Sequence, residues 1–208
     1  CPDGECLDPI MLKDLDQRLA DLPAEQRRRG TVVVLHEMGS HGPAYFKRSA
    51  PALKKFQPEC TSTNLQECTQ EQVVNAYDNS IVQTDQFLDS VLNWLSDQSD
   101  KAQTAMIYVA DHGESLGENN IYLHGLPYSI APDVQKHVPW ITWLSPAMQA
   151  RTHVTTGCLQ QDVAQRRVTH DNYFHSVLGL MDVQTGAYSP ALDMFAGCRQ
   201  QPNGPLAG

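Results

Sequence analysis

The stretch that decides the fold runs from residue 105 to residue 127 and reads AMIYVADHGESLGENNIYLHGLP. It opens with an apolar run at residues 105–110, whose length and composition predict a buried strand. Asp111 and His112 follow where that strand must end, and in open α/β sheets the chemistry gathers beyond the carboxyl ends of the strands. A carboxylate oxygen beside an imidazole nitrogen suits Zn²⁺, although two residues alone are also typical of a hydrogen-bonded surface pair. The glycines that follow and a second imidazole, His124, favour the metal site.

A second strand is expected at residues 31–36, which read TVVVLH and follow a glycine. Their β-branched and nearly continuous apolar character is typical of a buried parallel strand. A glycine-rich loop comes next and carries His41, so two strand ends present histidines in the same context. We interpret His36 as a core or supporting histidine and leave His41 open between a site residue and a solvated loop residue. Together, the two loops predict a metal-dependent site.

Helix signals precede each of these strands. Asp8, followed by proline, is suited to cap an amphipathic helix at the N-terminus, and the basic residues 23–30 are expected to form a solvated loop. Thr69 and Gln72 have the spacing of a capping box at the start of the longest helix. The polar residues in the first turns of that helix, Asn79 among them, are interpreted as solvated.

The end of the chain continues the alternation of strands and helices. A strand is expected at residues 138–144, starting near a proline, and a last helix at residues 173–181. Residues 200–208 are expected to fray. This alternation predicts an α/β fold with a mostly parallel sheet between helices.

Composition limits the class of protein. The 208 residues suffice for one domain with a sizeable core. The net charge of −9 argues against a nucleic-acid surface, which needs clustered lysine and arginine. No apolar run reaches the ~20 residues of a membrane helix, and we see no signal peptide, so the sequence is expected to be a piece of something larger.

The six cysteines favour disulfides over a zinc knuckle, because no pair has the spacing of zinc ligands with a matching second pair. Cys1 is five residues from Cys6, and a polar loop separates Cys60 from Cys68. We propose these two short-loop pairs, which leaves Cys158 for Cys198, although the sequence allows fifteen pairings. Disulfides would indicate an oxidising compartment.

Four motifs carry a resemblance to a known family: GSHGP at residues 39–43, YDN at 77–79, DHGESLGEN at 111–119 and YLHG at 122–125. With them the chain resembles the lipid A phosphoethanolamine transferases, which include the mobile colistin-resistance enzymes and belong to the alkaline phosphatase/sulfatase superfamily. The similarity runs through nearly the whole chain. It implies a three-layer α/β/α sandwich with a mostly parallel sheet, as in alkaline phosphatase.

The resemblance also assigns roles to four residues. Asp111 and His112 match two ligands of the catalytic zinc, and His41 and His124 match histidines that contact the transferred phosphate group or a second zinc. Such enzymes move phosphoethanolamine from phosphatidylethanolamine to a lipid A phosphate at the periplasmic face of the bacterial inner membrane. They give resistance to polymyxins such as colistin. We expect a monomer that does not bind nucleic acid.

The family's threonine nucleophile and a further zinc-binding glutamate should lie upstream of Cys1, as should the membrane domain. Residues 1–208 would then be the C-terminal part of a periplasmic catalytic domain, inactive alone because covalent catalysis needs its nucleophile. One alternative is another phosphodiesterase or phosphoglycerol transferase of the same superfamily. The others are a non-catalytic periplasmic metal-binding module and a structural domain stabilised by disulfides.

Overall fold

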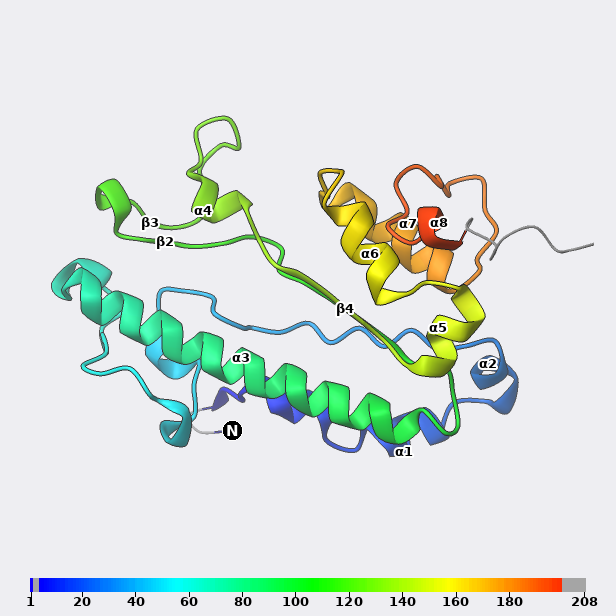
Figure 1. The fold of residues 1–208 in the computed structure, drawn as a ribbon. Helices are drawn as coiled ribbons and strands as arrows, with labels where there is room; N and C mark the ends of the chain where they lie inside the picture. Colours follow the sequence, from blue (N-terminus) through cyan, green and yellow to red (C-terminus); the bar gives the residue numbers. More distant parts are fainter. Residues whose placement is uncertain (2–3, 200–208) are drawn as a thin grey trace, which may run out of the picture. The chain divides into compact units, whose positions relative to one another are not determined.

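The computed structural model describes residue 1 and residues 4–199, drawn as a ribbon in Figure 1. The chain divides into two compact units: unit 1 comprises Cys1–Trp94 and Tyr108–Ile141, and unit 2 comprises Leu95–Ile107 and the chain from Thr142 onward. Among the described residues, no helix is both long and apolar enough to cross a membrane. The fraying expected at residues 200–208 concerns a segment outside the described residues.

Unit 1 contains short helices, most of the longest helix and one hairpin of short strands. Its elements are η2 (Asp8–Leu12), α1 (Leu15–Ala20), α2 (Ala24–Arg28), η3 (Tyr45–Lys47), η4 (Pro51–Leu53), η5 (Leu65–Glu67), α3 (Gln70–Gln98), β2 (Ser115–Leu116), η6 (Glu118–Asn120), β3 (Tyr122–Leu123) and α4 (Asp133–Lys136), where η marks a 3-10 helix. The basic residues expected in a loop therefore form α2 instead. They are exposed, as expected.

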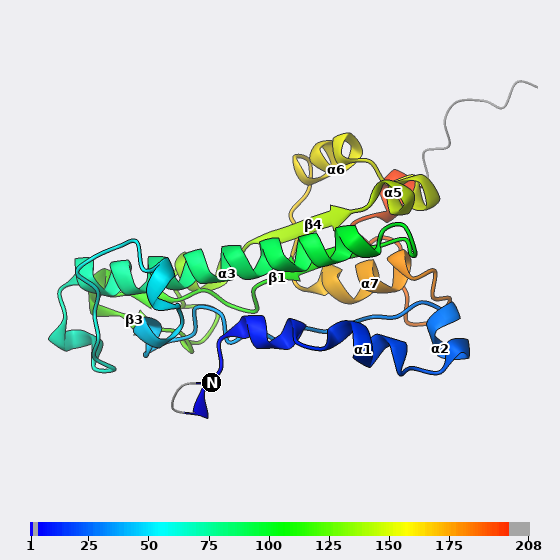
Figure 2. The ribbon, with the colours of Figure 1, turned by 90° about the horizontal axis from the view of Figure 1, so that it is seen from below.

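Helix α3 begins as the capping box predicts. The Thr69 N–H donates to Gln72 Oε1 at 2.9 Å, and the Gln72 N–H donates to Thr69 Oγ1 at 3.3 Å. The helix is the longest element in both ribbon views (Figure 2). Its first turns contribute Val73 and Ala76 to a hydrophobic core cluster of unit 1, together with Tyr45, Cys60 and Leu65.

The next turn of α3 is polar and buried, which contradicts the solvated role expected for its first polar residues. Asn79 is fully buried. Its Oδ1 accepts the Phe56 N–H, and its Nδ2 donates to the Phe56 carbonyl and to Glu59 Oε2, at 2.9–3.0 Å. These three bonds hold an irregular segment against the helix, because a buried amide is stable only when it is hydrogen-bonded.

The strands pair in antiparallel directions. β2 pairs with β3, with Ser115 opposite Leu123. β1 (Ala105–Val109) pairs with β4 (Trp140–Leu144). At one end of this pair the Ser145 N–H donates to the Thr104 carbonyl, and at the other the Ala110 N–H donates to the Pro139 carbonyl. The two strands are therefore antiparallel. The strands predicted at residues 105–110 and 138–144 are therefore confirmed. The mostly parallel sheet is not found among the described residues.

Residues 31–36 do not form the predicted strand. They have no strand partner among the described residues, and Val32 and Val34 are 55% and 78% exposed. His36, interpreted as a core or supporting histidine, is exposed as well. An apolar β-branched run becomes a strand only when another strand supplies hydrogen bonds and a surface to pack on, and the described chain supplies neither.

Asp8 also differs from its predicted role. It lies in η2 and makes no side-chain cap. Its two carboxylate oxygens instead accept the backbone N–H groups of Met38 and Gly39, both at 2.9 Å. The residue that looked like a helix cap thus holds a loop thirty residues away.

Unit 2 is mainly helical. Its complete helices are α5 (Pro146–Thr152), α6 (Thr156–Val163), α7 (Asp171–Leu180) and α8 (Ala196–Arg199). α7 confirms the predicted last helix in part, since α8 follows it. α5 and α6 were not predicted. Ser145 and Thr155 cap them by accepting the N–H groups of Met148 and Cys158, and serine and threonine at such positions are typical of helix starts.

The three proposed disulfides are all confirmed. Cys1 is bonded to Cys6 and Cys60 to Cys68, both in unit 1. Cys158 is bonded to Cys198, which ties α6 to α8 in unit 2. No cysteine is free.

The Asn79 network provides a direct test of this packing. An Asn79→Ala substitution leaves the Phe56 N–H and the Glu59 carboxylate short of partners, and we expect unfolding to become easier by about 2–3 kcal/mol. Urea denaturation followed by circular dichroism measures the change. Asn93→Ala is the matched control, because Asn93 is exposed in the same helix and bonds only Asp89; equal losses for both variants would contradict the role given to Asn79.

Candidate metal site formed by three histidines

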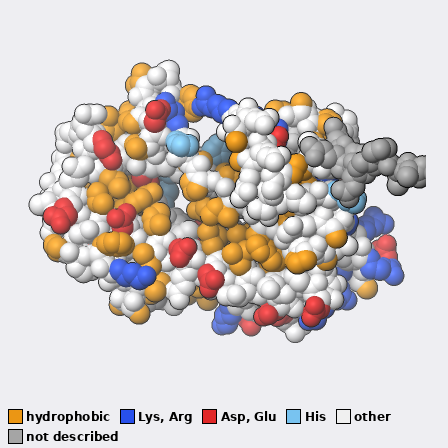
Figure 3. Space-filling view, in the orientation of Figure 1, with side chains coloured by type: hydrophobic (Ala, Val, Ile, Leu, Met, Phe, Trp, Pro, Cys, Tyr) orange, Lys and Arg blue, Asp and Glu red, His pale blue; other side chains and the backbone are white. Residues whose placement is uncertain are grey.

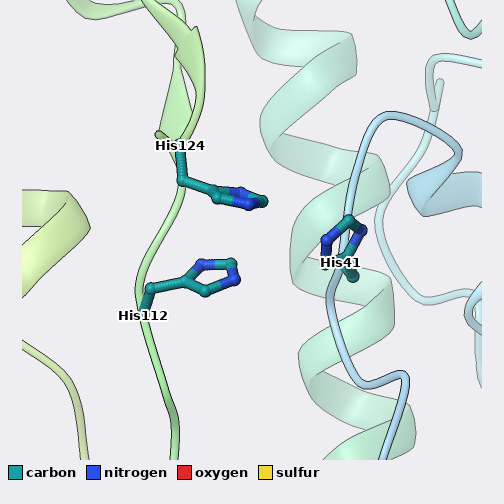
Figure 4. Close-up of side chains that lie close together, drawn as sticks. All are labelled: His41, His112 and His124. Carbon is teal, nitrogen blue, oxygen red and sulfur yellow. The ribbon is translucent and has the colours of Figure 1, made fainter. Parts of the chain in front are cut away.

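Three histidine side chains from three separate loops of unit 1 point toward one another (Figure 4). One ring nitrogen from each of His41, His112 and His124 lies within 4.8 Å of the other two, a grouping that can hold a metal ion. The His112 and His124 rings stack with centroids 3.7 Å apart, and the His41 ring centroid lies 5.9 Å and 5.1 Å from them. His41 and His124 are exposed and His112 is partly so, and histidine side chains are visible at the surface in Figure 3. The site is open to solutes.

The hairpin of β2 and β3 brings two of these imidazoles together. His112 precedes β2 and His124 follows β3 immediately, and the Ser115–Leu123 register places these two ends of the hairpin side by side. The pairing explains why residues twelve positions apart in the sequence stack their rings. The long motif of residues 111–124 is therefore one structural unit.

Gly42 allows the third loop to approach. A Cβ atom at this position would lie 2.5 Å from Leu123 Cδ2 and 2.7 Å from Tyr45 Oη, so a larger residue would force these side chains to move. Since Leu123 precedes His124 and Gly42 follows His41, this close contact brings the loops of the two imidazoles together.

Each imidazole is held through its Nδ1 atom. His41 Nδ1 lies 2.7 Å from the Gly42 carbonyl and His112 Nδ1 lies 3.0 Å from the Gly113 carbonyl, while His124 Nδ1 lies 3.2 Å from Glu114 Oε1. Carbonyl oxygens accept hydrogen bonds but cannot donate them, so Nδ1 carries the proton in His41 and His112. The Nε2 lone pair is then available, which is the arrangement found in histidines that ligate metals.

Asp111 lies beside this group and not within it. Its side chain is 84% exposed, Oδ1 accepts the His112 backbone N–H at 3.0 Å, and the same oxygen is 3.8 Å from His112 Nε2. Two atoms bound at ~2.1 Å to one zinc ion are at most ~4.2 Å apart. The separation from His112 therefore suits a shared ion. The structure thus brings His41, His112 and His124 together and leaves Asp111 at the edge.

The donor set fits zinc. Neutral imidazoles and one carboxylate are common zinc ligands, and an open coordination position is typical of catalytic zinc sites. The 4.8 Å limit on the distances among the three imidazole nitrogens is slightly larger than ~4.2 Å, so a single ion would require small rotations of the exposed rings. A phosphate group between two imidazoles and a zinc ion is the other arrangement that the spacing admits.

Two acidic residues that support the site were not predicted. Asp8 binds the backbone of the turn before His41. Glu114 is buried, and its Oε1 accepts the Gly42 N–H at 3.2 Å as well as contacting His124. Glu114 lies within the recognised motif, which was a usable signal, whereas no local pattern marks Asp8 as a partner of residues 38–39.

Glu37 stands at the start of the same loop with a buried carboxylate oxygen that lacks a hydrogen bond. Burial, followed by the charge of Asp8, raises the pKa of its carboxyl from 4.5 to about 7. The protein must therefore ionise a poorly solvated acid within the physiological range of pH.

Comparison with known proteins gives consistent matches. The model of the family described as Sulfatase matches residues 1–183. The chain is 46% identical over 200 residues to the phosphoethanolamine transferase EptA of Salmonella typhimurium, an alignment that covers 96% of this chain and 36% of that protein. It is 40% identical over 182 residues to the phosphatidylethanolamine transferase Mcr-1 of Escherichia coli, covering 88% of this chain and 31% of that protein.

A solved structure agrees with these sequence matches. The integral membrane protein lipooligosaccharide phosphoethanolamine transferase A of Neisseria meningitidis superposes with a TM-score of 0.89 at 41% identity. The match covers 97% of this chain and 37% of that chain. The chain thus spans about a third of the length of the relatives it matches.

The raised pKa of Glu37 predicts how stability depends on pH. Below pH 4.5 the acid is protonated in both folded and unfolded chains; between 4.5 and about 7 the folded chain binds more protons, so the contribution of Glu37 to stability is lost as pH rises. A Glu37→Gln variant should therefore gain stability relative to wild type across that window, measured as the difference in thermal midpoint at pH 4 and pH 8.

Glu67→Gln supplies the opposite case as a control. Hydrogen bonds from Ser62 and Asn64 lower the pKa of Glu67, so its contribution is present above pH 4.5 and lost as pH falls. This variant should lose stability relative to wild type as pH rises. A pH-independent difference for Glu37→Gln would refute the assignment.

Proposed function

The chain belongs to the sulfatase family, and from this premise we propose that it is the metal-binding part of a zinc-dependent phosphoethanolamine transferase. The reaction is transfer of phosphoethanolamine from phosphatidylethanolamine to a lipid A phosphate. The observation that carries the proposal is the convergence of three imidazoles with their Nδ1 atoms engaged and Nε2 atoms free. The names of the relatives, phosphoethanolamine and phosphatidylethanolamine transferases, support the choice of substrate.

In this proposal Asp111 and His112 hold the catalytic zinc, and His41 and His124 bind the transferred phosphate group or a second zinc. When bound, zinc neutralises phosphate oxygens and lowers the pKa of a coordinated hydroxyl. The two exposed imidazoles lie beside His112, where they can orient the phosphate group. Fixed hydrogen-bonding groups of this kind stabilise charge that develops in the transition state.

The whole enzyme is proposed to be longer than this chain. Residues 1–208 are the C-terminal part of a periplasmic catalytic domain, joined in the complete protein to a membrane domain and to a segment with the threonine nucleophile. The Neisseria relative is an integral membrane protein of which this chain matches about a third, which supports this organisation. The complete protein is then a monomer at the periplasmic face of the inner membrane that protects the cell from polymyxins.

The complete domain is also proposed to hold the three-layer sandwich with a mostly parallel sheet. The support lies in residues 31–36, whose valines are exposed and unpaired among the described residues. A strand from the rest of the domain would cover them and complete their hydrogen bonds.

Zinc content tests the metal site. After loading with zinc and exhaustive dialysis, the purified chain should retain about one zinc ion. The His112→Ala variant should retain far less, because it lacks one of the two side chains, His112 and Asp111, that are proposed to hold the ion. His137→Ala is the matched control, an exposed histidine outside the three-histidine group. A wild-type chain that keeps no zinc, or a His112→Ala chain that keeps as much, would contradict the proposal.

A second prediction concerns the isolated chain. Incubated with phosphatidylethanolamine, these 208 residues should form no covalent phosphoethanolamine adduct by intact-protein mass spectrometry, because the nucleophile is proposed to lie upstream. An adduct would show that a residue of this chain is the nucleophile.

The complete protein is the positive control for that experiment. It should form the adduct with phosphatidylethanolamine and not with phosphatidylglycerol, and His124→Ala should suppress it while His137→Ala should not. An adduct formed from phosphatidylglycerol alone would instead identify a phosphoglycerol transferase.

A further inference from the structure

We propose that Glu114 is a positioning residue that holds His124 in one tautomer, with Tyr45 and Gly42 holding Glu114 in turn. The inference rests on the proposed function only in treating the three histidines as the working site. It concerns how the protein orients a ligand before any ligand is bound.

Glu114 contacts the loops of all three histidines. It lies two residues after His112, its Oε1 accepts the N–H of Gly42, the neighbour of His41, and the same oxygen is 3.2 Å from His124 Nδ1. Its side chain is only 4% exposed. A buried carboxylate is costly unless hydrogen bonds or an opposite charge compensate it, so these contacts hold the three loops together as well as stabilising the acid.

The contact decides which nitrogen of His124 is free. Glu114 Oε1 already accepts the Gly42 N–H, so it faces His124 Nδ1 as the acceptor for a second donor. Nδ1 then carries the proton and Nε2 keeps its lone pair. His41 and His112 reach the same state through backbone carbonyls, which no substitution can remove. His124 alone depends on a side chain, and a carboxylate also makes the imidazole a stronger ligand.

Tyr45 supports this acid from the buried side. Its side chain is fully buried. Because Gly42 has no Cβ, the Tyr45 hydroxyl can lie against Gly42, whose N–H donates to Glu114. Burial, followed by the charge of Glu114, raises the pKa of the Tyr45 phenol, so the phenol remains an O–H donor. Tyr45 Oη and Glu114 Oε2 are both buried without a partner of good hydrogen-bond geometry, and one O–H···O bond, formed by a small side-chain movement, satisfies both.

The test is ¹⁵N NMR of the histidine side chains in the metal-free chain, at a pH at which the imidazoles are neutral. The Nδ1 and Nε2 shifts report the tautomer directly, a readout that a purely structural role would not move. His124 of the wild-type chain should be the Nδ1–H tautomer. In Glu114→Gln the population should move toward Nε2–H, and the affinity for zinc should fall about 10–100-fold.

Two further variants sharpen the result. Tyr45→Phe keeps the acid and removes the O–H, and should shift His124 in the same direction by less. Asp133→Asn removes one charge from a fully solvated side chain of the same unit and should change neither readout.

An Nε2–H tautomer in the wild-type chain, or an unchanged His124 spectrum in Glu114→Gln, would overturn the proposal. The wild-type spectrum decides by itself if Glu114→Gln does not fold. A wild-type chain that binds no zinc would count against the proposed function, whereas the tautomer of His124 would still decide the role of Glu114.

Discussion

Side chains bind the backbone of residues 38–56 where a neighbouring strand would do so in a regular sheet. Asp8 binds the N–H groups of residues 38 and 39, and Glu114 binds that of residue 42. From helix α3, Gln83 binds the N–H of residue 50 and Asn79 binds both backbone groups of residue 56. Because buried or half-buried backbone groups need partners, these few acids and amides determine the path of the segment that carries His41.

This arrangement has consequences for the histidine site. The pairing of β2 with β3 holds His112 and His124 together through backbone bonds, but His41 reaches them only because its loop is held by side chains and because Gly42 permits close contact with Leu123. Two of the three loops thus form a local unit, and the third is joined to it by long-range contacts. Glu114 is the residue common to both, because its Oε1 accepts the Gly42 N–H beside His41 and contacts His124 Nδ1.

The two acidic residues of this motif, Asp111 and Glu114, have different roles: one can bind a metal ion and the other positions a histidine. Asp111 is exposed and close to His112, as a ligand for a cation should be, whereas Glu114 is buried and faces His124 Nδ1 and the Gly42 N–H. Carboxylates therefore serve two purposes in one motif, distinguished by burial and by their partners. A metal site needs both, since ligands without orienting partners bind metal weakly.

The sequence by itself determined the features that depend on short-range interactions. The capping box of α3, strand β1 and the two short-loop disulfides involve residues close in the chain. The four short motifs, at residues 39–43, 77–79, 111–119 and 122–125, were sufficient to identify the family and its candidate histidines. The pairing of Cys158 with Cys198 followed only by elimination.

Only the tertiary structure decided that residues 31–36 form no strand, that the strands pair antiparallel, that Asn79 is buried, and that Asp8 and Glu114 support the site. The physical reason is that each of these, apart from the β2–β3 pairing, depends on the presence or absence of a partner tens of residues away. A carboxylate or amide looks the same in the sequence whether it faces water, caps a helix or binds a distant N–H group.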